Sequence, residues 1–216
     1  MRCVVTAGPT YEELDQVRRL TNFSTGTLGC GLADYLAAKG HEVELLVGYY
    51  ATCGLPVLAQ RRQVFTTTAD LSQRLEALAS PDARAVFHAA AVSDFMFGKI
   101  WSRTGAGELR QVQAAKISTR AEGLLAELKP TPKIIRQLRG WFPKGLLTGW
   151  KYELDGDHAQ AVARGEEQMR ECALDACVVN GRAYGAGYGL LRREAGAAHL
   201  ADAQELFAAL ESIARS

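Results

Sequence analysis

Short apolar runs alternate with stretches of helical periodicity along most of this chain. Runs that are β-branched or continuously apolar predict strands at Cys3–Ala7, Glu42–Gly48, Gln63–Thr67, Ala85–Val92, Leu146–Trp150 and Ala176–Asn180. Apolar residues at helical spacing predict helices at about 28–39, 68–80, 131–138, 157–172 and 203–214. Strands that alternate with helices are typical of a parallel sheet covered on both faces. The pattern therefore predicts an α/β fold with a Rossmann-like, open, mainly parallel sheet and helices on both faces.

Residues 95–129 interrupt this alternation. They contain Phe95, Phe97 and Trp101, several glycines, and an alternating stretch at Glu108–Val112. Such a pattern favours a β-hairpin or flap over another strand–helix unit. Because no linker or repeat divides the chain, we expect residues 1–216 to form one domain with this flap inside it.

Three smaller features complete the predicted architecture. Tyr188–Arg193 and Ala197–Leu200 predict a terminal hairpin. Residues 49–60 and the polar stretch that follows Thr10 have no clear period, so we expect irregular loops there.

Composition excludes several classes of protein. The formal net charge is +1, which argues against general binding to nucleic acid or to a membrane surface. The five cysteines are odd in number and lack metal-site spacing, so we expect reduced thiols in a cytoplasmic protein. The sequence contains no recognisable signal peptide or membrane span.

The connection from the first strand to the first helix is the strongest candidate for a binding site. Gly8 ends the strand, and Asn22, Ser24, Thr25 and Gly26 lead into the helix. In an open parallel sheet this junction binds phosphate groups through free N–H groups of the first helical turn. An alternative is that Ser24 or Thr25 serves only as the helix N-cap.

Two other residues of this segment have equally open interpretations. Gly29, three positions after Gly26, is consistent with simple close packing of helix and sheet, because the dinucleotide glycine spacing is missing. Arg18, four positions before Asn22, either meets a carboxylate or phosphate or is a solvated loop cation.

Charged and polar residues at other strand ends extend the candidate site. Asp94 follows a buried strand directly, where a carboxylate is placed to hold Mg²⁺ with nucleotide phosphates; the alternative is a turn cap. Asn180 ends a later strand and could bond a base, a ribose or its own loop. Lysines near the flap and strand ends could offset polyphosphate charge, although each is also consistent with solvated surface: Lys99, Lys116, Lys129, Lys133 and Lys151. His88, inside an apolar strand, is expected to be structural.

Taken together, the motifs resemble the phosphopantothenate–cysteine ligase family, which many bacteria carry as the second half of a bifunctional flavoprotein. The resemblance covers nearly the whole chain. It rests on Val5–Thr10, Leu14-Asp15-x-Val17-Arg18, Asn22-x-Ser24-Thr25-Gly26, Ala89–Phe95, Lys116-Ile117, Leu128-Lys129-x-Thr131-Pro132-Lys133-Ile134 and Val178-Val179-Asn180.

The resemblance implies a reaction and its participants. The carboxylate of 4'-phosphopantothenate attacks the α-phosphate of CTP or ATP in the presence of Mg²⁺, and pyrophosphate leaves. The amino group of L-cysteine then attacks the acyl-nucleotidyl anhydride. By the same resemblance, Asn22 holds the acyl carbonyl, Arg18 lies close by, and Lys116 assists activation or the cysteine step. The nucleotide and its Mg²⁺ would be held by Gly8, Ser24, Thr25, Gly26, Ala90, Asp94, Phe95, Lys129, Lys133, Lys151 and Asn180.

Three departures from the family pattern leave the choice between CTP and ATP open. Phe23 stands where bacterial members usually have His, and Lys116-Ile117-Ser118-Thr119 lacks two lysines of the bacterial motif. Gly149–Glu153 resembles the eukaryotic version, which uses ATP, more than the bacterial version, which prefers CTP. With no decarboxylase half preceding the ligase motifs, we expect no bound flavin.

Two other functions are kept as alternatives. The first is an NAD(P)-dependent short-chain oxidoreductase, against which stand the missing glycine spacing, the missing ribose-binding acid after Val47 and the missing Tyr-x-x-x-Lys. The second is a non-catalytic nucleotide-binding relative. We also expect a homodimer, because the flap has few local partners to cover its aromatic residues.

Overall fold

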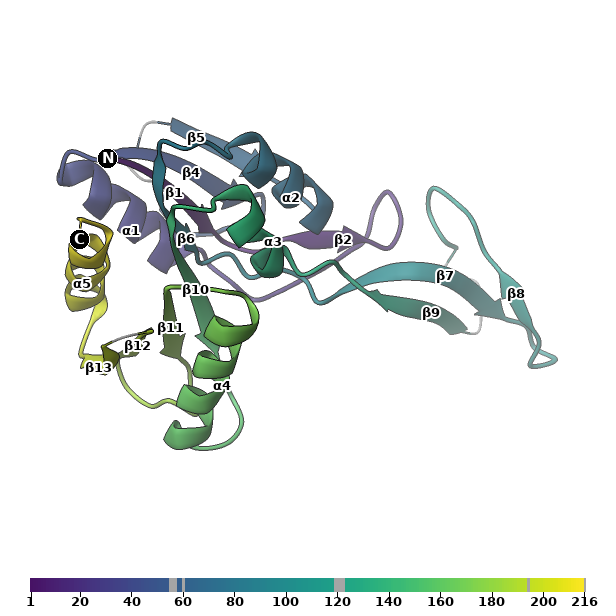
Figure 1. The fold of residues 1–216 in the computed structure, drawn as a ribbon. Helices are drawn as coiled ribbons and strands as arrows, with labels where there is room; N and C mark the ends of the chain where they lie inside the picture. Colours follow the sequence, from purple (N-terminus) through teal and green to yellow (C-terminus); the bar gives the residue numbers. More distant parts are fainter. Residues whose placement is uncertain (55–57, 60, 119–122, 194, 216) are drawn as a thin grey trace.

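The structure, a computed structural model, describes residues 1–54, 58–59, 61–118, 123–193 and 195–215. In this part of the chain, eight strands form one sheet in the order β13-β12-β11-β10-β6-β1-β4-β5 (Figure 1). They are β1 (Arg2–Ala7), β4 (Glu42–Gly48), β5 (Arg61–Phe65), β6 (Ala83–His88), β10 (Leu146–Tyr152), β11 (Ala176–Asn180), β12 (Tyr188–Arg192) and β13 (Gly196–Leu200). The pairs from β5 to β11 are parallel, and the terminal hairpin adds two antiparallel pairs. The predicted mainly parallel, Rossmann-like sheet is confirmed.

The order of the strands creates a switch point in the middle of the sheet. From β1 the chain first builds outward through β4 and β5, and then returns to β6 on the other side of β1. Ligands of open α/β sheets bind beyond the carboxyl ends of the strands at such a reversal. The register places Thr6 opposite His88, so the segments that follow β1 and β6 leave the sheet side by side.

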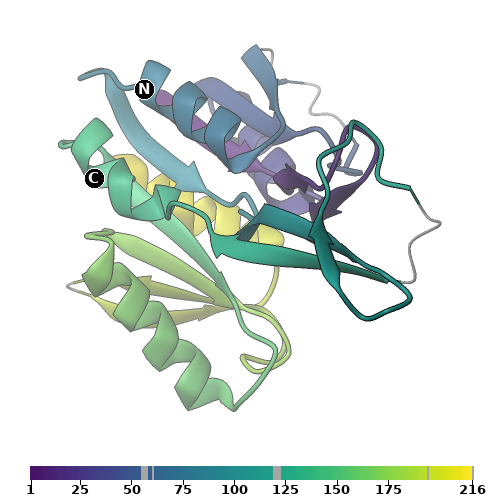
Figure 2. The ribbon, with the colours of Figure 1, turned by 90° about the vertical axis from the view of Figure 1, so that its right-hand side faces the viewer.

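Helices cover both faces of the sheet, as predicted (Figure 2). They are α1 (Thr27–Ala38), α2 (Thr68–Ala77), α3 (Ile134–Trp141), α4 (His158–Glu171) and α5 (Ala203–Arg215). Successive strand residues face opposite sides. Thus Val5 of β1 packs in one cluster with residues of α1 and α5, whereas Val4 packs in the other with residues of α2, α3 and α4. Burial on both faces explains why the central strands are continuously apolar.

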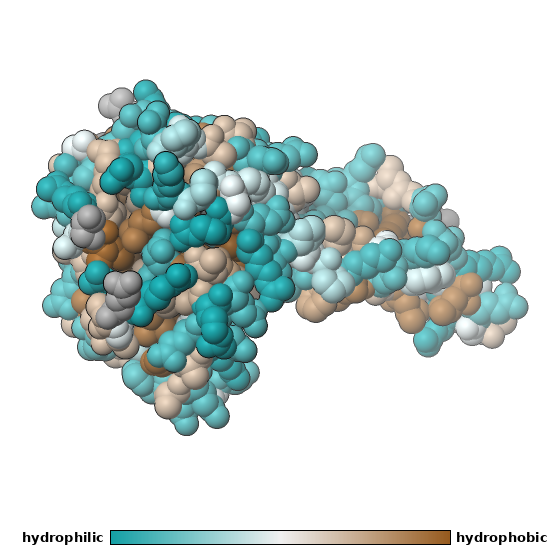
Figure 3. Space-filling model, in the orientation of Figure 1, coloured by the Kyte–Doolittle hydropathy of each residue, from teal (hydrophilic) through white to brown (hydrophobic). Residues whose placement is uncertain are grey.

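Two smaller sheets project from the carboxyl edge of the main sheet. One is the hairpin of β2 (Tyr11–Glu13) and β3 (Arg19–Thr21). The other is the predicted flap, an antiparallel sheet of β7 (Phe95–Arg103), β8 (Leu109–Gln111) and β9 (Gly123–Pro130) in the order β8-β7-β9. Figure 3 shows the flap as an arm that extends away from the body and carries apolar surface. Residues 119–122, within the predicted flap, lie outside the described residues.

Long-range contacts shift several predicted boundaries. The stretch after Thr10 is a hairpin, not an irregular loop. Strand β6 ends at His88, not Val92, because the Ala90 and Ala91 N–H groups bond to the Thr6 hydroxyl and the Gly8 carbonyl instead of continuing the ladder. Of the predicted loop at 49–60, residues 55–57 and 60 lie outside the described residues.

Capping explains the remaining shifts. Strand β5 ends at Phe65 because Thr67 becomes the N-cap of α2, its hydroxyl accepting the Asp70 N–H at 3.2 Å. Helix α3 begins at Ile134 with Lys133 as its N-cap residue, so Pro132 precedes the first turn that it was expected to occupy. Helix α4 begins after an Asp157–Gln160 capping box, as the predicted start near residue 157 requires.

Candidate functional site

Three loops converge beyond the carboxyl ends of β1 and β4. Gly8 and Gly26 both have φ of +80°, and a Cβ added to Gly26 would lie 3.1 Å from the Gly8 nitrogen. A Cβ on Gly8 would lie 2.7 Å from Cβ of Ala51. The loop that contains Ala51 is joined to the loop before α1 by two hydrogen bonds, from the Thr52 and Cys53 N–H groups to the Thr25 carbonyl oxygen. Gly8 and Gly26, 18 positions apart in sequence, thus lie next to each other in the structure.

The N-terminus of α1 faces this junction. Gly26 is its N-cap residue, and in the described part of the chain no side chain caps it. Ser24 and Thr25 are therefore not N-caps, although the Thr25 hydroxyl accepts the Thr27 N–H at 3.3 Å. No acidic residue lies in the first turn. The helix presents its positive end to an anion, as the phosphate-binding prediction requires.

Gly29 has a packing role instead. A Cβ at this position would lie 2.6 Å from Cβ of Ala7 and 2.8 Å from the Thr6 carbonyl oxygen. Only glycine lets α1 approach β1 this closely. The interpretation of Gly29 as a close-packing residue is confirmed.

Asn22 lies against the segment that follows β6. Its Nδ2 donates to the carbonyl oxygens of Ala91 and Val92, at 3.3 Å in each case. The same segment is hydrogen-bonded to the loop after β1, because the Ala91 N–H donates to the Gly8 carbonyl oxygen at 3.0 Å. The exposed amide of Asn22 is thus two residues from Asp94 along the backbone it touches. Asn22 and the Asp94 segment share one edge of the sheet.

The predicted site residue Ala90 is held by a buried polar contact. Its N–H donates to the Thr6 hydroxyl at 3.0 Å, and that hydroxyl lies 3.0 Å from Nδ1 of His88. His88 is fully buried, and burial lowers its pKa to about 4, so the ring is neutral near pH 7. The structural role expected for His88 fits these contacts.

Four predicted residues gather where the flap leaves the sheet. Asp94 forms an ion pair with Lys133, and both side chains are exposed. Phe95 begins β7 opposite Pro130, and Lys129 lies opposite Met96. The Lys129 Nζ is 3.6 Å from a carboxylate oxygen of Glu127. Cationic and carboxylate groups therefore stand together at the flap base.

Asp94 is the candidate metal ligand. Across the described residues, no three His, Cys, Asp or Glu side chains are grouped to hold a metal ion. A lone carboxylate suits Mg²⁺ that arrives with nucleotide phosphates, since Mg²⁺ uses few protein ligands and keeps several waters.

Lys151 and Asn180 lie farther along the same edge. They stand on β10 and β11, the first and second neighbours of β6, roughly 5 and 10 Å away. Lys151 Nζ is 3.3 Å from Glu153. Asn180 lines a cavity of about 520 Å³ together with Tyr152, Gly181, Arg182, Gly185, Gly187, Tyr188, Ala201, Asp202 and Ala203.

Arg18 lies at the tip of the β2–β3 hairpin, and Asn22 follows β3 at the hairpin base. At the tip, the Arg18 guanidinium donates to the Ile117 carbonyl oxygen at 2.7 Å, beside Lys116 in sequence. Arg18 is thus not a solvated loop cation, because Asp15 and the flap backbone hold it. Of the two alternatives for Arg18, the structure shows the contact with a carboxylate. Of the flap motif, Thr119 lies outside the described residues.

The sequence-based reasoning missed a role for Asp15, whose side chain is 1% exposed. Its pKa is held well below the usual range, first by the Arg18 guanidinium and then by the N–H groups of Ile117, Val17 and Arg18. The signals in the sequence were its place in the motif Leu14-Asp15-x-Val17-Arg18 and its spacing of three positions from Arg18. An acidic residue at that spacing is equally consistent with an exposed ion pair between Asp15 and Arg18.

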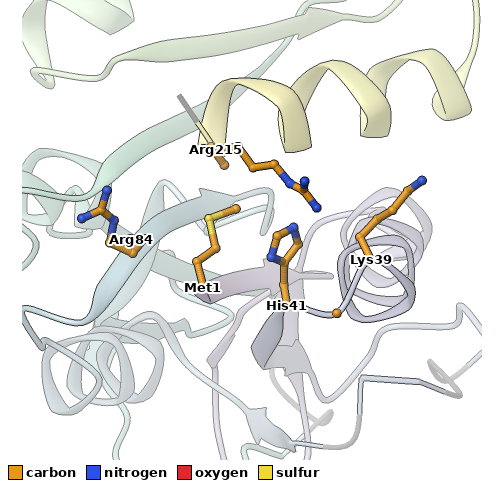
Figure 4. A pocket seen from close by; sticks show the side chains of 7 residues that line it. Met1, Lys39, His41, Arg84 and Arg215 are labelled. Atoms are coloured by element: carbon orange, nitrogen blue, oxygen red, sulfur yellow. The ribbon is translucent and has the colours of Figure 1, made fainter.

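A separate pocket of about 420 Å³ lies at the opposite, amino-terminal edge of the sheet (Figure 4). It is lined by Met1, Lys39, Gly40, His41, Arg84, Ala214 and Arg215. His41 is bonded to Glu211 at 2.9 Å, and the ends of Lys39 and Arg84 point away from each other. The pocket contains none of the predicted site residues.

Comparisons with known proteins agree with this fold. The family model of the DNA/pantothenate metabolism flavoprotein C-terminal domain matches residues 1–211. The coenzyme A biosynthesis bifunctional protein CoaBC of Thermococcus kodakarensis is 28% identical over 180 residues, covering 83% of this chain and 41% of that protein. Its namesake in Bacillus subtilis is 32% identical over 189 residues, covering 86% and 42%. The chain thus spans less than half the length of these relatives.

Solved structures show the same fold. The DNA/pantothenate metabolism flavoprotein from Streptococcus pneumoniae superimposes with a TM-score of 0.86 at 26% identity, covering 100% of this chain and 98% of that one. A Cab2 variant in complex with phosphopantothenate-cysteine gives a TM-score of 0.72 at 18% identity, covering 99% and 85%. In the described residues, no helix has the length and apolar character needed to cross a membrane. This chain belongs to the family of the DNA/pantothenate metabolism flavoprotein C-terminal domain.

Proposed function

We propose that this chain is a nucleotide-dependent ligase that joins 4'-phosphopantothenate to L-cysteine through an acyl-nucleotidyl intermediate in coenzyme A biosynthesis. The observation that carries the proposal is the position of Asn22. Its amide is bonded to the segment after β6, at the sheet edge that the uncapped N-terminus of α1 also faces. The family and the names of its relatives support the same reaction. We treat residues 1–216 as one ligase unit with a flap.

In the first half-reaction, a carboxylate oxygen of phosphopantothenate bonds to the α-phosphorus, and the bond to pyrophosphate breaks. Negative charge grows on the phosphoryl oxygens. The N–H groups at the start of α1 and the cations Lys129 and Lys133 are arranged to offset it. Gly8 and Gly26 leave room for phosphate to approach the backbone.

In the second half-reaction, the amino nitrogen of cysteine bonds to the acyl carbon, and the nucleoside monophosphate leaves. The amino group loses a proton in the process. Asn22 would turn one of the two N–H groups that now bond Ala91 and Val92 toward the acyl carbonyl, whose oxygen gains charge as the nitrogen attacks. Lys116, exposed on the flap, is proposed to assist activation or this step.

Asp94 is the carboxylate that would hold Mg²⁺, with nucleotide phosphates and water as the other ligands. Lys133, its present partner, is then available to a phosphate. The nucleotide is CTP or ATP, with Ser24, Thr25, Ala90, Phe95, Lys151 and Asn180 as further contacts. The five free cysteines support a cytoplasmic protein.

We propose a homodimer as well. The flap exposes Phe95 (46%), Leu109 (50%) and Leu128 (49%), and neighbouring Leu124 and Leu125 are also exposed. An apolar surface that projects from the body is typical of an interface. Analytical ultracentrifugation at micromolar concentration tests this: we expect the mass of two chains, and a monomer would contradict the proposal.

One coupled assay tests the ligase proposal. Purified protein receives 4'-phosphopantothenate, L-cysteine and Mg²⁺ with either CTP or ATP, and both pyrophosphate and the amide product are measured. We expect pyrophosphate release that depends on the acid and an amide that also requires cysteine. In Asn22→Ala, amide formation should fall on the order of 100-fold, as for loss of one oxyanion donor. Gln137→Ala, which removes an exposed amide from α3, is the control.

The outcomes separate the possible functions. Nucleotide binding without pyrophosphate release would favour a non-catalytic relative. Normal amide formation in Asn22→Ala would contradict the role of Asn22, whereas a wild-type protein inactive with both nucleotides would overturn the ligase proposal.

A further inference from the structure

Both backbone polar groups of Ile117, the residue after Lys116, are held by one ion pair on the β2–β3 hairpin. The Asp15 carboxylate accepts the Ile117 N–H at 3.1 Å. The Arg18 guanidinium donates to the Ile117 carbonyl oxygen at 2.7 Å. Asp15 and Arg18 are also bonded to each other, through Nε of Arg18 at 3.0 Å. The β2–β3 hairpin thus binds the flap through both backbone groups of Ile117.

These contacts extend to the other side of Lys116. The Gln16 N–H donates to the Ala115 carbonyl oxygen at 3.0 Å. Hairpin contacts therefore fix the backbone at both residues that flank Lys116. The Ile117 side chain is 3% exposed, whereas the Lys116 side chain is exposed. Hydrogen bonds at Ala115 and Ile117 and the buried Ile117 side chain hold this segment in place. The Lys116 side chain remains in solvent.

The carboxylate that binds Ile117 is surrounded by donors. Its Oδ1 accepts the Val17 and Arg18 N–H groups at 2.9 and 2.8 Å, and its Oδ2 accepts from Arg18 and Ile117. Oδ1 therefore shapes the hairpin tip, and Oδ2 holds the flap. A buried carboxylate with this many donors stays charged at neutral pH, so protonation does not remove these hydrogen bonds there.

We propose that Asp15 and Arg18 form a latch that positions Lys116 for the ligase reaction, an inference that rests on the proposed function. Both are positioning residues. Arg18 then affects the chemistry through the place where it holds the flap, without touching substrate. Its role in the proposal is to hold the flap backbone next to Lys116. Displacement of a reacting group by about 1 Å can cost on the order of 100-fold in rate.

Asp15→Asn is the sharpest test, because it separates the two ends of the carboxylate. An amide can keep its oxygen toward the Val17 and Arg18 N–H groups. Its NH₂ group then faces the Arg18 and Ile117 donors and cannot accept from them. The variant should keep the hairpin tip and release the flap.

We expect kcat for amide formation to fall at least tenfold in Asp15→Asn, with the KM for nucleotide within about twofold of wild type. The decisive measurement is a double-mutant cycle. If Asp15 acts through Lys116, then Asp15→Asn combined with Lys116→Ala should be no slower than Lys116→Ala alone. Asp15→Asn combined with Asn22→Ala should show the product of the two single effects. Arg18→Lys, which keeps the charge but replaces the planar, forked guanidinium with a compact ammonium group, should recover part of the activity lost in Arg18→Ala.

Asp175→Asn is the matched control. Asp175 also pairs with an arginine and a backbone N–H, accepting from Arg139 at 2.7 Å and from Leu147 at 2.8 Å, but it lies under β10, away from the flap. We expect both Asp175→Asn and Asp15→Asn to lower the melting temperature. Only Asp15→Asn should lower kcat.

Hydrogen exchange at the Ile117 amide measures whether the bond to Asp15 is present, and it does not depend on ligase activity. Faster exchange in Asp15→Asn than in wild type is expected, and unchanged exchange would overturn the latch. An additive cycle between Asp15 and Lys116, or an equal loss of kcat in Asp175→Asn, would overturn the positioning role. If the wild-type protein proves inactive as a ligase, the proposed function fails, and the exchange result still decides whether the latch exists.

Discussion

The Thr6 hydroxyl lies 3.0 Å from Nδ1 of His88 and joins the two central strands at their carboxyl ends. The same hydroxyl accepts the Ala90 N–H, so this contact supports the backbone from which the candidate site begins. His88 is 4% exposed, so solvent can do little to stabilise an added proton. A titratable group thus sits directly beneath the site, in its neutral form.

The stability of the fold should therefore depend on pH below neutrality. Burial lowers the pKa of folded His88 to about 4, while the unfolded chain takes up the proton near its ordinary value of 6.5. Between these values the unfolded state binds more protons, so stability falls as pH decreases and is unaffected above about pH 7. At about 1.4 kcal/mol per pH unit, the loss down to pH 4 is about 3 kcal/mol.

Urea unfolding at pH 7.5, 6.0 and 5.0 measures this loss. His88→Gln, whose amide can bond Thr6 without titrating, should show a shallower decline than wild type, and His158→Gln, an exposed histidine, should not. If the free energy of unfolding falls equally with decreasing pH in wild type and His88→Gln, His88 is not the group responsible.

Sequence patterns predicted the central strands well because burial on both faces leaves a continuous apolar run. Glu42–Gly48 and Ala176–Asn180 have their predicted bounds for this reason. The β2–β3 hairpin was missed because its stability comes from distant partners. The Glu12 carboxylate accepts the Thr68 N–H at 3.0 Å, and Asp15 binds Ile117, 102 residues away. Neither contact leaves a local period in the sequence.

The candidate site divides in the same way. Strand-end reasoning brought Gly8, Gly26 and Asp94 to one edge, because parallel strands share their carboxyl ends. It could not place Arg18, since the direction of a hairpin tip depends on what the tip contacts. Nor could the motif show that Asp94 pairs with Lys133, 39 positions later, after the whole flap has intervened.

A disulfide should form between Cys30 and Cys53, next to the loop that precedes α1. Sγ of Cys30, in the first turn of α1, lies 2.7 Å from Sγ of Cys53, in the loop after β4, and both cysteines are free. A covalent bond needs a separation of about 2.0 Å, a small further approach. With oxidised glutathione, one thiolate displaces glutathione and the second closes the bridge, releasing another. We expect a mass loss of about 2 Da and two fewer alkylatable thiols.

Cys53→Ser is the control, because it removes one partner and permits at most a mixed disulfide with glutathione. Cys3 and Cys177 should remain free in both proteins, since both are completely buried in the core and glutathione cannot reach them. Retention of all five thiols after prolonged exposure would show that the two sulfurs cannot bond.

We expect replacement by alanine to have opposite effects on stability at Gly29 and at Gly140. An added Cβ at Gly29 would press on Ala7 and Thr6 of β1, so Gly29→Ala should destabilise the fold by about 2–3 kcal/mol. Gly140, within α3, has nothing within 4 Å of an added Cβ. Gly140→Ala should stabilise by up to about 1 kcal/mol, through lower backbone entropy of the unfolded chain. Denaturant midpoints measure both, and a stable Gly29→Ala would show that α1 can move off the sheet.

Asp94→Asn tests whether the carboxylate at the flap base serves the metal. The amide cannot supply a charged oxygen to Mg²⁺, and it also leaves Lys133 without its partner. If Asp94 holds Mg²⁺, the Mg²⁺ concentration for half-maximal rate should rise on the order of tenfold. If Asp94 only restrains Lys133, the Mg²⁺ requirement should be unchanged and the KM for nucleotide should alter, because a freed lysine meets the phosphates differently. Asp82→Asn, at the opposite end of β6, should change neither quantity. A Mg²⁺ requirement that stays at its wild-type value in Asp94→Asn would therefore remove Asp94 from the metal site and leave it as the partner of Lys133.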